Sequence, residues 1–209
     1  MIQYIPTQKQ PANSVFFSPL PLNPLPSINK EWTLFLDRDG VINEEVIGDY
    51  IKRWEDFHFR PGSLEAIAKL TPLFKHIIVT SNQAGVGKGL MTSDELNIIT
   101  EKMVNEIEAN DGRITKTYYC TATDNNDINR KPNPGMALQA KNDFPDIDFS
   151  KTIMVGNMPN DMLFGKKFGA FTVYLPTREE EKPDPSTVDA VYKDLLAFAN
   201  DLCKQQITQ

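Results

Sequence analysis

The stretch Leu34-Phe35-Leu36-Asp37-Arg38-Asp39-Gly40 (residues 34–40) decides the fold of this chain. Three apolar residues lead into Asp37, and a second carboxylate, Asp39, follows two positions later. A short, continuous apolar run is typical of a strand that is buried on both faces of a parallel sheet. Because such sheets bind ligands beyond the carboxyl ends of their strands, we expect Asp37 and Asp39 to lie at a functional edge.

Outward from this strand, short apolar strands alternate with helical segments. Thr92 and Glu95 have the spacing of a capping box and predict a helix that runs to about residue 109. The alternation predicts an α/β fold in three layers, with a central parallel sheet covered on both faces. The expected strands are 34–36, 77–80, 117–120, 153–155 and 171–175, and the other expected helices are 63–73, 134–144, from about 160, and 194–204.

Residues 1–30 differ from the remainder, because six of the 15 prolines fall within them. Proline fixes φ and lacks an N–H donor, so neither a helix nor a central strand is expected there. We therefore divide the chain into a proline-rich arm, 1–30, and one domain, 31–209. The arm is also apolar, so we expect it to lie against the body or against a neighbouring subunit. We expect a monomer, with a dimer formed through the arm as the alternative.

The net charge of −6 argues against a nucleic-acid partner, because a long polyanion is repelled by an acidic protein. The two cysteines, Cys120 and Cys203, form no CxxC pair, which favours a reducing compartment. The sequence contains neither a signal-peptide pattern nor an apolar run long enough to cross a membrane. The expectation is a cytoplasmic protein without a membrane partner.

The carboxylates of Asp37 and Asp39 would repel each other if both were ionised, and a bound Mg²⁺ ion would relieve that repulsion. A carboxylate can also attack phosphorus, while a second one transfers protons. Ser81 begins a glycine-rich segment, 81–89, whose hydroxyl and backbone N–H groups can hold phosphate oxygens. The alternatives are a solvated acidic turn for the first motif and an ordinary flexible connection for the second.

Two later segments supply further candidates. Arg130 and Lys131 can hold a phosphate and neutralise a carboxylate–phosphate pair, although a basic loop before a helix would have the same sequence. Asn157 and Asp161 offer oxygen ligands for Mg²⁺. The alternative there is that Asn160 or Asp161 caps a short helix.

In this order, the residues resemble the four motifs of the haloacid dehalogenase superfamily of phosphatases. Asp37 and Asp39 match the first motif, Ser81 the second, Lys131 the third, and 156–161 the fourth. Within that superfamily the chain is similar to the D-glycero-D-manno-heptose 1,7-bisphosphate phosphatases and to their relatives, the histidinol-phosphate phosphatases. The segments that carry this similarity are DRDGVIN (37–43), SNQAGVGKG (81–89), YYC (118–120), RKPNPGM (130–136) and MVGNMPNDM (154–162).

The resemblance implies a Rossmann-like fold with little or no cap domain, an open site and Mg²⁺. Asp37 would be the nucleophile and Asp39 the general acid and base, while Ser81 and Lys131 would hold the transferring phosphate. The metal ligands would be Asp37, Asp39, Asn157 and Asp161. Residues expected near the substrate are Arg38, Asn82, Gln83, Lys88 and Arg130.

Three positions depart from the family pattern. Asn157 replaces the usual aspartate, so we expect weaker metal binding, for which Asp161 could compensate. Met158 replaces a lysine that often contacts the substrate. Many members bind zinc through Cys-x-His and Cys-x-Cys pairs, but only Cys120 remains here, since Ala122, Asp127 and Asn129 fill the other places. We therefore expect no zinc and a shortened loop.

The prediction for function is a Mg²⁺-dependent phosphatase that forms an aspartyl-phosphate and acts on a small phosphorylated metabolite, most simply a heptose bisphosphate. The alternatives are a histidinol-phosphate or nucleotide phosphatase, a phosphatase for 3′-phosphate ends of nucleic acids, and a catalytically impaired domain with a binding role. The last alternative is motivated by Asn157.

Overall fold

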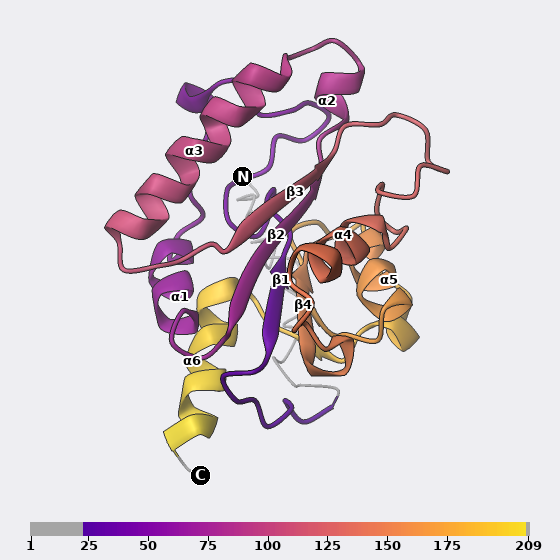
Figure 1. The fold of residues 1–209 in the computed structure, drawn as a ribbon. Helices are drawn as coiled ribbons and strands as arrows, with labels where there is room; N and C mark the ends of the chain where they lie inside the picture. Colours follow the sequence, from indigo (N-terminus) through magenta and orange to yellow (C-terminus); the bar gives the residue numbers. More distant parts are fainter. Residues whose placement is uncertain (1–22, 208–209) are drawn as a thin grey trace, which may run out of the picture.

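The structure is a computed structural model that describes residues 23–207. Within them, the chain forms a six-stranded parallel sheet in the order β3-β2-β1-β4-β5-β6 (Figure 1). The strands are β1 (Thr33–Leu36), β2 (His76–Asn82), β3 (Lys116–Cys120), β4 (Thr152–Gly156), β5 (Phe171–Tyr174) and β6 (Ala190–Val191). The predicted α/β class with a parallel sheet is confirmed.

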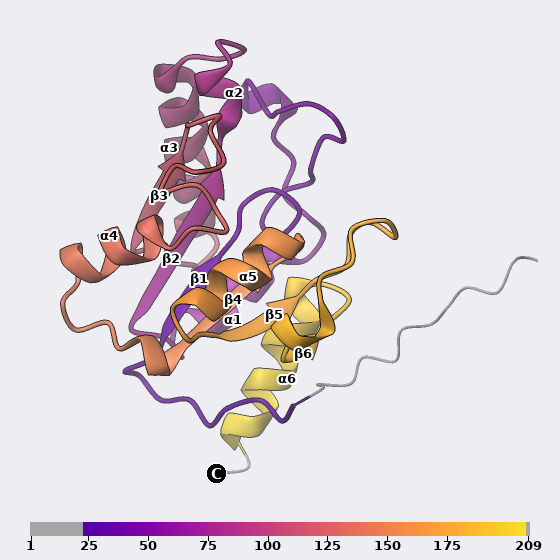
Figure 2. The same cartoon turned by 90° about the vertical axis from the view of Figure 1, so that its right-hand side faces the viewer.

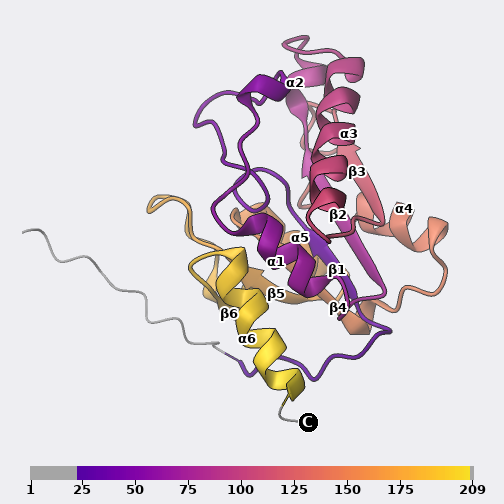
Figure 3. The same ribbon diagram turned by 90° about the vertical axis from the view of Figure 1, so that its left-hand side faces the viewer.

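Helices cover both faces of the sheet. Figure 3 shows α1, α3 and α6 on one face, and Figure 2 shows α4 and α5 on the other. Side chains of the central strands alternate between the two cores, because successive residues of a strand point to opposite faces. Leu34 and Leu36 join the larger core, while Phe35 joins the smaller one. The main helices are α1 (Ser63–Leu70), α3 (Ser93–Ala109), α4 (Gly135–Asp143), α5 (Pro159–Lys167) and α6 (Leu195–Ile207).

The strand β1 lies between β2 and β4, and its last residue, Leu36, pairs in register with Val79 and Val155. The N–H of Asp37 then donates to the carbonyl of Val155 at 2.9 Å. The strand order reverses direction at β1, which makes the carboxyl ends of these three strands a topological switch point. The fold therefore brings the segments after β1, β2 and β4 together at one edge.

Most predicted elements are present, with small differences at their ends. The Thr92 hydroxyl accepts a hydrogen bond from the Glu95 N–H at 3.1 Å, and the Glu95 carboxylate accepts one from the Thr92 N–H at 2.7 Å, which confirms the capping box. The helix expected over 63–73 ends at Leu70. Two short elements, α2 (Ala84–Gly87) and β6, were not predicted, since four and two residues are too few for a periodic pattern.

Part of the predicted N-terminal arm is described. Leu25 and Ile28 are buried in the larger core, and the Asn23 side chain donates to the Asp189 carboxylate at 3.1 Å. The prediction for the remainder of the arm falls on residues outside the described range. Among the described residues, no helix combines the length and apolar character needed to cross a bilayer.

The glycine at position 165 lets α5 approach the sheet closely. A Cβ atom there would lie 2.7 Å from Thr172 Cγ2 and 2.9 Å from Met154 Cβ, both on the sheet. Gly165→Ala should therefore lower the free energy of unfolding by about 1–3 kcal/mol, although alanine favours helices. Urea denaturation measures this change. Leu163→Ala, at an exposed position of the same helix, should cost less than about 0.5 kcal/mol. A Gly165→Ala protein as stable as the parent would contradict the tight packing.

Candidate active site

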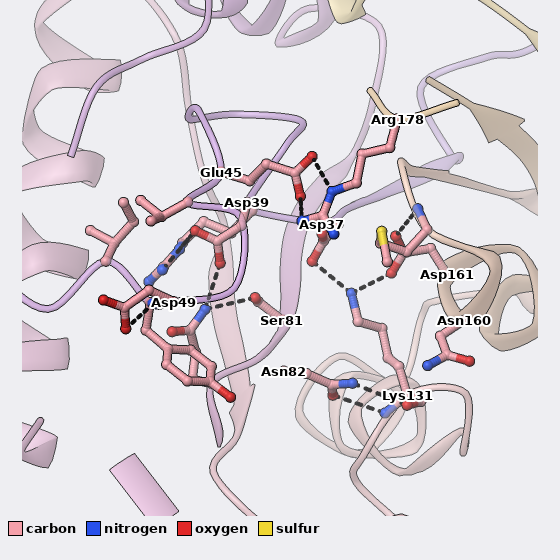
Figure 4. A pocket seen from close by; sticks show the side chains of 16 residues that line it. Asp37, Asp39, Glu45, Asp49, Ser81, Asn82, Lys131, Asn160, Asp161 and Arg178 are labelled. Atoms are coloured by element: carbon pink, nitrogen blue, oxygen red, sulfur yellow. Dashed lines mark hydrogen bonds and ion pairs between the residues drawn. The ribbon is translucent and has the colours of Figure 1, made fainter. Parts of the chain in front are cut away.

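A cavity of about 270 Å³ opens at the carboxyl edge of the sheet (Figure 4). It is lined by residues from the segments that follow β1, β2, β3 and β4, so the four predicted motifs meet in one place. Residues of the loop 45–51 and Arg178 complete its wall. The predicted residues that line the cavity are Asp37, Arg38, Asp39, Ser81, Asn82, Gln83, Lys131 and Asp161.

Lys131 holds the motifs together. Its ammonium group lies 2.7 Å from Asp37 Oδ1, 2.6 Å from Asp161 Oδ1 and 2.8 Å from the carbonyl oxygen of Thr80, and the side chain is only 3% exposed. The backbone of Lys131 is fixed too, because the Asn82 side chain accepts from its N–H at 2.9 Å and donates to its carbonyl at 3.0 Å. The cation therefore joins the segments after β1 and β4 to the strand β2.

The two carboxylates of the first motif have opposite pKa shifts. Burial, reinforced by the charge of Asp161, raises the pKa of Asp37 to about 7, and Lys131 opposes this shift. Burial also acts to raise the pKa of Asp39, but the charge and hydrogen bonds of Arg38 outweigh it, and the pKa of Asp39 is lowered. Asn43 and Gln83 also donate to Asp39, at 2.9 and 2.8 Å.

Ser81 is placed by the same network. The side-chain amide of Gln83 donates to Ser81 Oγ at 2.9 Å while it donates to Asp39. Ser81 lies at the end of β2 and Gln83 in the turn that follows, and both line the cavity. Figure 4 shows Ser81 among the cavity residues. Ser81 Oγ therefore lies beside the acidic motif, where it can donate to an anion.

The fourth motif supplies a carboxylate and an amide with different surroundings. Asp161 Oδ2 accepts from the N–H groups of Asn157 and Met158 at 3.1 and 3.0 Å, and its other oxygen contacts Lys131. Asn157 is completely buried, and its Oδ1 has no hydrogen-bond partner among residues 23–207. A Cβ at Gly40 would lie 2.1 Å from Asn157 Nδ2, so only glycine fits beneath this amide.

Three residues predicted to contact substrate have other contacts. Arg38 lines the cavity but is fully buried and bound to Asp39. Lys88 and Arg130 do not line the cavity: Lys88 donates to the Tyr50 hydroxyl at 2.9 Å, and Arg130 donates to the carbonyl of Ala122 at 3.1 Å. The positions of Lys88 and Arg130 outside the cavity therefore do not support their predicted role as direct substrate contacts.

Sequence reasoning missed the wall formed by Glu45, Asp49, Tyr50 and Arg178. Glu45 Oε1 accepts from Arg178 Nε at 3.1 Å, and Arg178 Nη2 contacts the other oxygen of the same carboxylate. Arg178 follows β5 by four residues, but the other three lie in the loop between β1 and α1, and the four have no characteristic spacing. The sequence therefore offered no local pattern that would have identified them.

The loop at the usual zinc position is held by hydrogen bonds. The Cys120 thiol contacts Asp127 Oδ1 at 3.8 Å, and the Asn133 side chain donates to the carbonyl of Asp127 at 2.9 Å. Within residues 23–207, no group of three or more His, Cys, Asp and Glu side chains is arranged to hold a metal ion. The residues of this loop therefore do not fit a Cys/His zinc site.

The raised pKa of Asp37 predicts a pH-dependent cost of folding. The folded pKa of about 7 exceeds the ordinary value of about 3.9, so folding loses up to about 1.4 kcal/mol per pH unit as pH rises from 4 to 7. Asp37→Asn should remove this loss. Urea denaturation in EDTA should show that the variant's stability advantage grows between pH 4 and 7 and then levels off. An advantage that is independent of pH would contradict the assignment.

Comparison with known proteins agrees with this geometry. A sequence model of the family described as "Polynucleotide kinase 3 phosphatase" matches residues 34–197. The D-glycero-alpha-D-manno-heptose-1,7-bisphosphate 7-phosphatase of Mycobacterium tuberculosis is 35% identical over 63% of this chain and 70% of its own length. The enzyme of the same name from Campylobacter jejuni is 32% identical over 81% of this chain and 96% of its own length.

A solved structure is also similar. The D,D-heptose 1.7-bisphosphate phosphatase from B. bronchiseptica, complexed with magnesium and phosphate, has a TM-score of 0.76 and 27% sequence identity. The match covers 83% of this chain and 99% of that structure. The chain thus belongs to the polynucleotide kinase 3 phosphatase family of haloacid dehalogenase-type phosphatases, and it is an enzyme that hydrolyses phosphate esters.

Proposed function

We propose that the protein is a Mg²⁺-dependent phosphatase that removes one phosphate from a heptose bisphosphate through an aspartyl-phosphate on Asp37. The observation that carries the mechanism is the Asp37 carboxylate, which lies in a cavity, bound on one oxygen to the buried Lys131. The names of the relatives support the sugar substrate, and the magnesium and phosphate of the solved relative support the cofactor.

The residues present fit a magnesium ion. Asp37, the backbone carbonyl of Asp39 and Asn157 Oδ1 would hold it, and all three are oxygen donors of the kind that Mg²⁺ prefers. The orphaned, buried Oδ1 of Asn157 supports this assignment, because a buried acceptor without a partner is costly. Asp161 would be a fourth ligand. One of its oxygens is bound to Lys131 and the other to backbone N–H groups, so one of them would have to give up that partner for the ion. When bound, the ion would neutralise charge on Asp37 and on the phosphate.

The protein groups divide the remaining work. One oxygen of Asp37 attacks phosphorus while the ester oxygen leaves with a proton from Asp39. In the second half, Asp39 takes a proton from water, which attacks phosphorus and releases Asp37. Arg38 favours the ionised form of Asp39 in the resting site, so Asp39 takes up a proton from solvent as the substrate binds, and the negative charge of the incoming phosphate favours that uptake. Lys131 and Ser81 Oγ stabilise the charge of the transferring group.

The family description raises a second candidate, the 3′-phosphate end of a polynucleotide. The charge of the chain argues against it, because binding to the phosphate backbone depends on neutralising cations and this chain has a net charge of −6. The cavity wall adds Glu45 and Asp49 near the site. We therefore favour a small sugar phosphate.

Phosphate release from a panel of substrates tests this proposal. The panel contains heptose 1,7-bisphosphate, histidinol phosphate, a nucleotide and a 3′-phosphorylated oligonucleotide, each with and without Mg²⁺. We expect the highest kcat/KM with the heptose bisphosphate and loss of activity in EDTA. If another substrate gave a higher kcat/KM, the proposed substrate would be wrong. If none of the substrates were hydrolysed, the result would favour a catalytically impaired domain with a binding role.

Two matched variants test the nucleophile. Asp37→Asn should lower kcat by at least about 10³-fold, because the amide is a far weaker nucleophile. Asp94→Asn removes one charge from an exposed position at the start of α3 and should leave kcat unchanged. Equal activity of Asp37→Asn and the parent would refute the mechanism, while circular dichroism verifies that both variants fold.

A further inference from the structure

The amide of Asn157 has two chemically different ends, unlike the aspartate that the resembled family usually carries at this position. A carboxylate presents an acceptor oxygen whichever way it turns, but an amide can present either an acceptor oxygen or two N–H donors. An amide that turned its Nδ2 toward a cation would repel it. The use of Asn157 as a ligand therefore requires something that fixes the orientation of its side chain.

A chain of hydrogen bonds leads away from Asn157 on the Nδ2 side. Asn157 Nδ2 donates to Thr177 Oγ1 at 2.9 Å, and Thr177 Oγ1 donates to Glu45 Oε1 at 2.7 Å. Arg178 contacts both oxygens of Glu45, one of them through Nε at 3.1 Å. The side chains of Glu45 and Arg178 are 14% and 23% exposed, so this pair is largely withdrawn from water.

Arg178, at the end of this series of hydrogen bonds that is farthest from Asn157, determines which group donates and which accepts in each bond. Arg178 can only donate, so the Glu45 oxygens that face it act as acceptors. Thr177 has a single hydroxyl proton, and Glu45 Oε1 takes it. The hydroxyl can then only accept from Asn157, so the group that faces Thr177 must be the N–H₂ group.

The same bonds determine where the Asn157 oxygen lies. With Nδ2 bound to Thr177, Oδ1 is left buried and without a partner among the described residues. The whole amide lies beside the turn of the first motif, since a Cβ built on Gly40 would be 2.1 Å from Nδ2 and 3.0 Å from Oδ1. The hydrogen bond to Thr177, rather than this proximity, is what distinguishes the two ends of the amide.

We propose that Thr177, Glu45 and Arg178 are positioning residues that hold the Asn157 amide with its oxygen available to a divalent cation. This inference rests on the magnesium site of the proposed function but not on the choice of substrate. It explains how a neutral amide can act as a metal ligand at a position where the family usually has a carboxylate. A carboxylate needs no such orientation, because both of its oxygens are acceptors. The three residues act through Asn157 and do not themselves contact the metal.

Binding of Mn²⁺ without substrate tests the proposal, because Mn²⁺ takes the same oxygen ligands and its free ion is measured by electron paramagnetic resonance. Thr177→Val keeps the shape of the side chain and removes the hydroxyl. It should raise the Kd for Mn²⁺ at least about tenfold, as loss of groups that orient metal ligands commonly does. Thr177→Ser keeps the hydroxyl and should stay within about threefold of the parent.

Changing the ligand separates orientation from general damage. In an Asn157→Asp background both ligand oxygens are acceptors, so Thr177→Val should change the Kd for Mn²⁺ by less than about threefold. An equal loss with and without the Asn157→Asp change, or no loss when Asn157 is retained, would overturn the proposal.

A second variant is available if Thr177→Val fails to fold. Glu45→Gln can donate to Thr177 and so allows the hydroxyl to turn toward Asn157, and it should weaken Mn²⁺ binding as Thr177→Val does; unchanged binding would overturn the proposal. If the parent itself binds no Mn²⁺, the magnesium site fails and the positioning role fails with it. If Mn²⁺ binds but no sugar phosphate is hydrolysed, only the proposed function is wrong.

Discussion

The buried ammonium of Lys131 between Asp37 and Asp161 is the interaction on which the site depends. It places one positive charge within 2.7 Å of two carboxylates that would otherwise repel each other at low dielectric. Removing one partner of such a group leaves an uncompensated buried charge, which costs far more than the loss of a surface ion pair. The same cation joins the segments that follow β1 and β4 to the strand β2. The arrangement of the site therefore depends on the order of the strands in the sheet.

The sheet topology explains why this charge cluster can exist. The strand β1 is flanked by β2 and β4, which run parallel to it and end three residues and one residue beyond the partners of Leu36, so polar side chains at these strand ends converge. Asp37 and Asp39 are two residues apart but meet opposite surroundings: Asp37 faces Asp161 and the cavity, while Asp39 is bound by Arg38. Two groups of one type thereby acquire different proton affinities, but the nucleophile Asp37 has the higher pKa of the two, which is the reverse of the usual pairing of a nucleophile with a proton donor.

Around this centre, hydrogen bonds take over tasks that charge or metal ligands perform in the resembled family. The amide of Asn157 is oriented through Thr177, and the loop after β3 is held by Asn133 and Arg130 where a zinc site is usual. Both arrangements depend on directional hydrogen bonds within short loops. Each therefore limits which residue types can occupy the neighbouring positions. Arg130, engaged with the carbonyl of Ala122, is an example of a cation used to support a loop at a distance from the cavity.

The sequence by itself determined five of the six strands, the five main helices, the capping box of α3 and the motif residues that line the cavity. These features have local signals: periodicity, cap spacing and polar residues directly after apolar runs. Only the tertiary structure decided that Lys88 and Arg130 lie outside the cavity and that Glu45, Thr177 and Arg178 act as a unit. Glu45 and Thr177 are 132 residues apart and carry no local pattern. Their contact arises because two irregular loops meet above the sheet, and the periodicity of the chain does not encode that meeting.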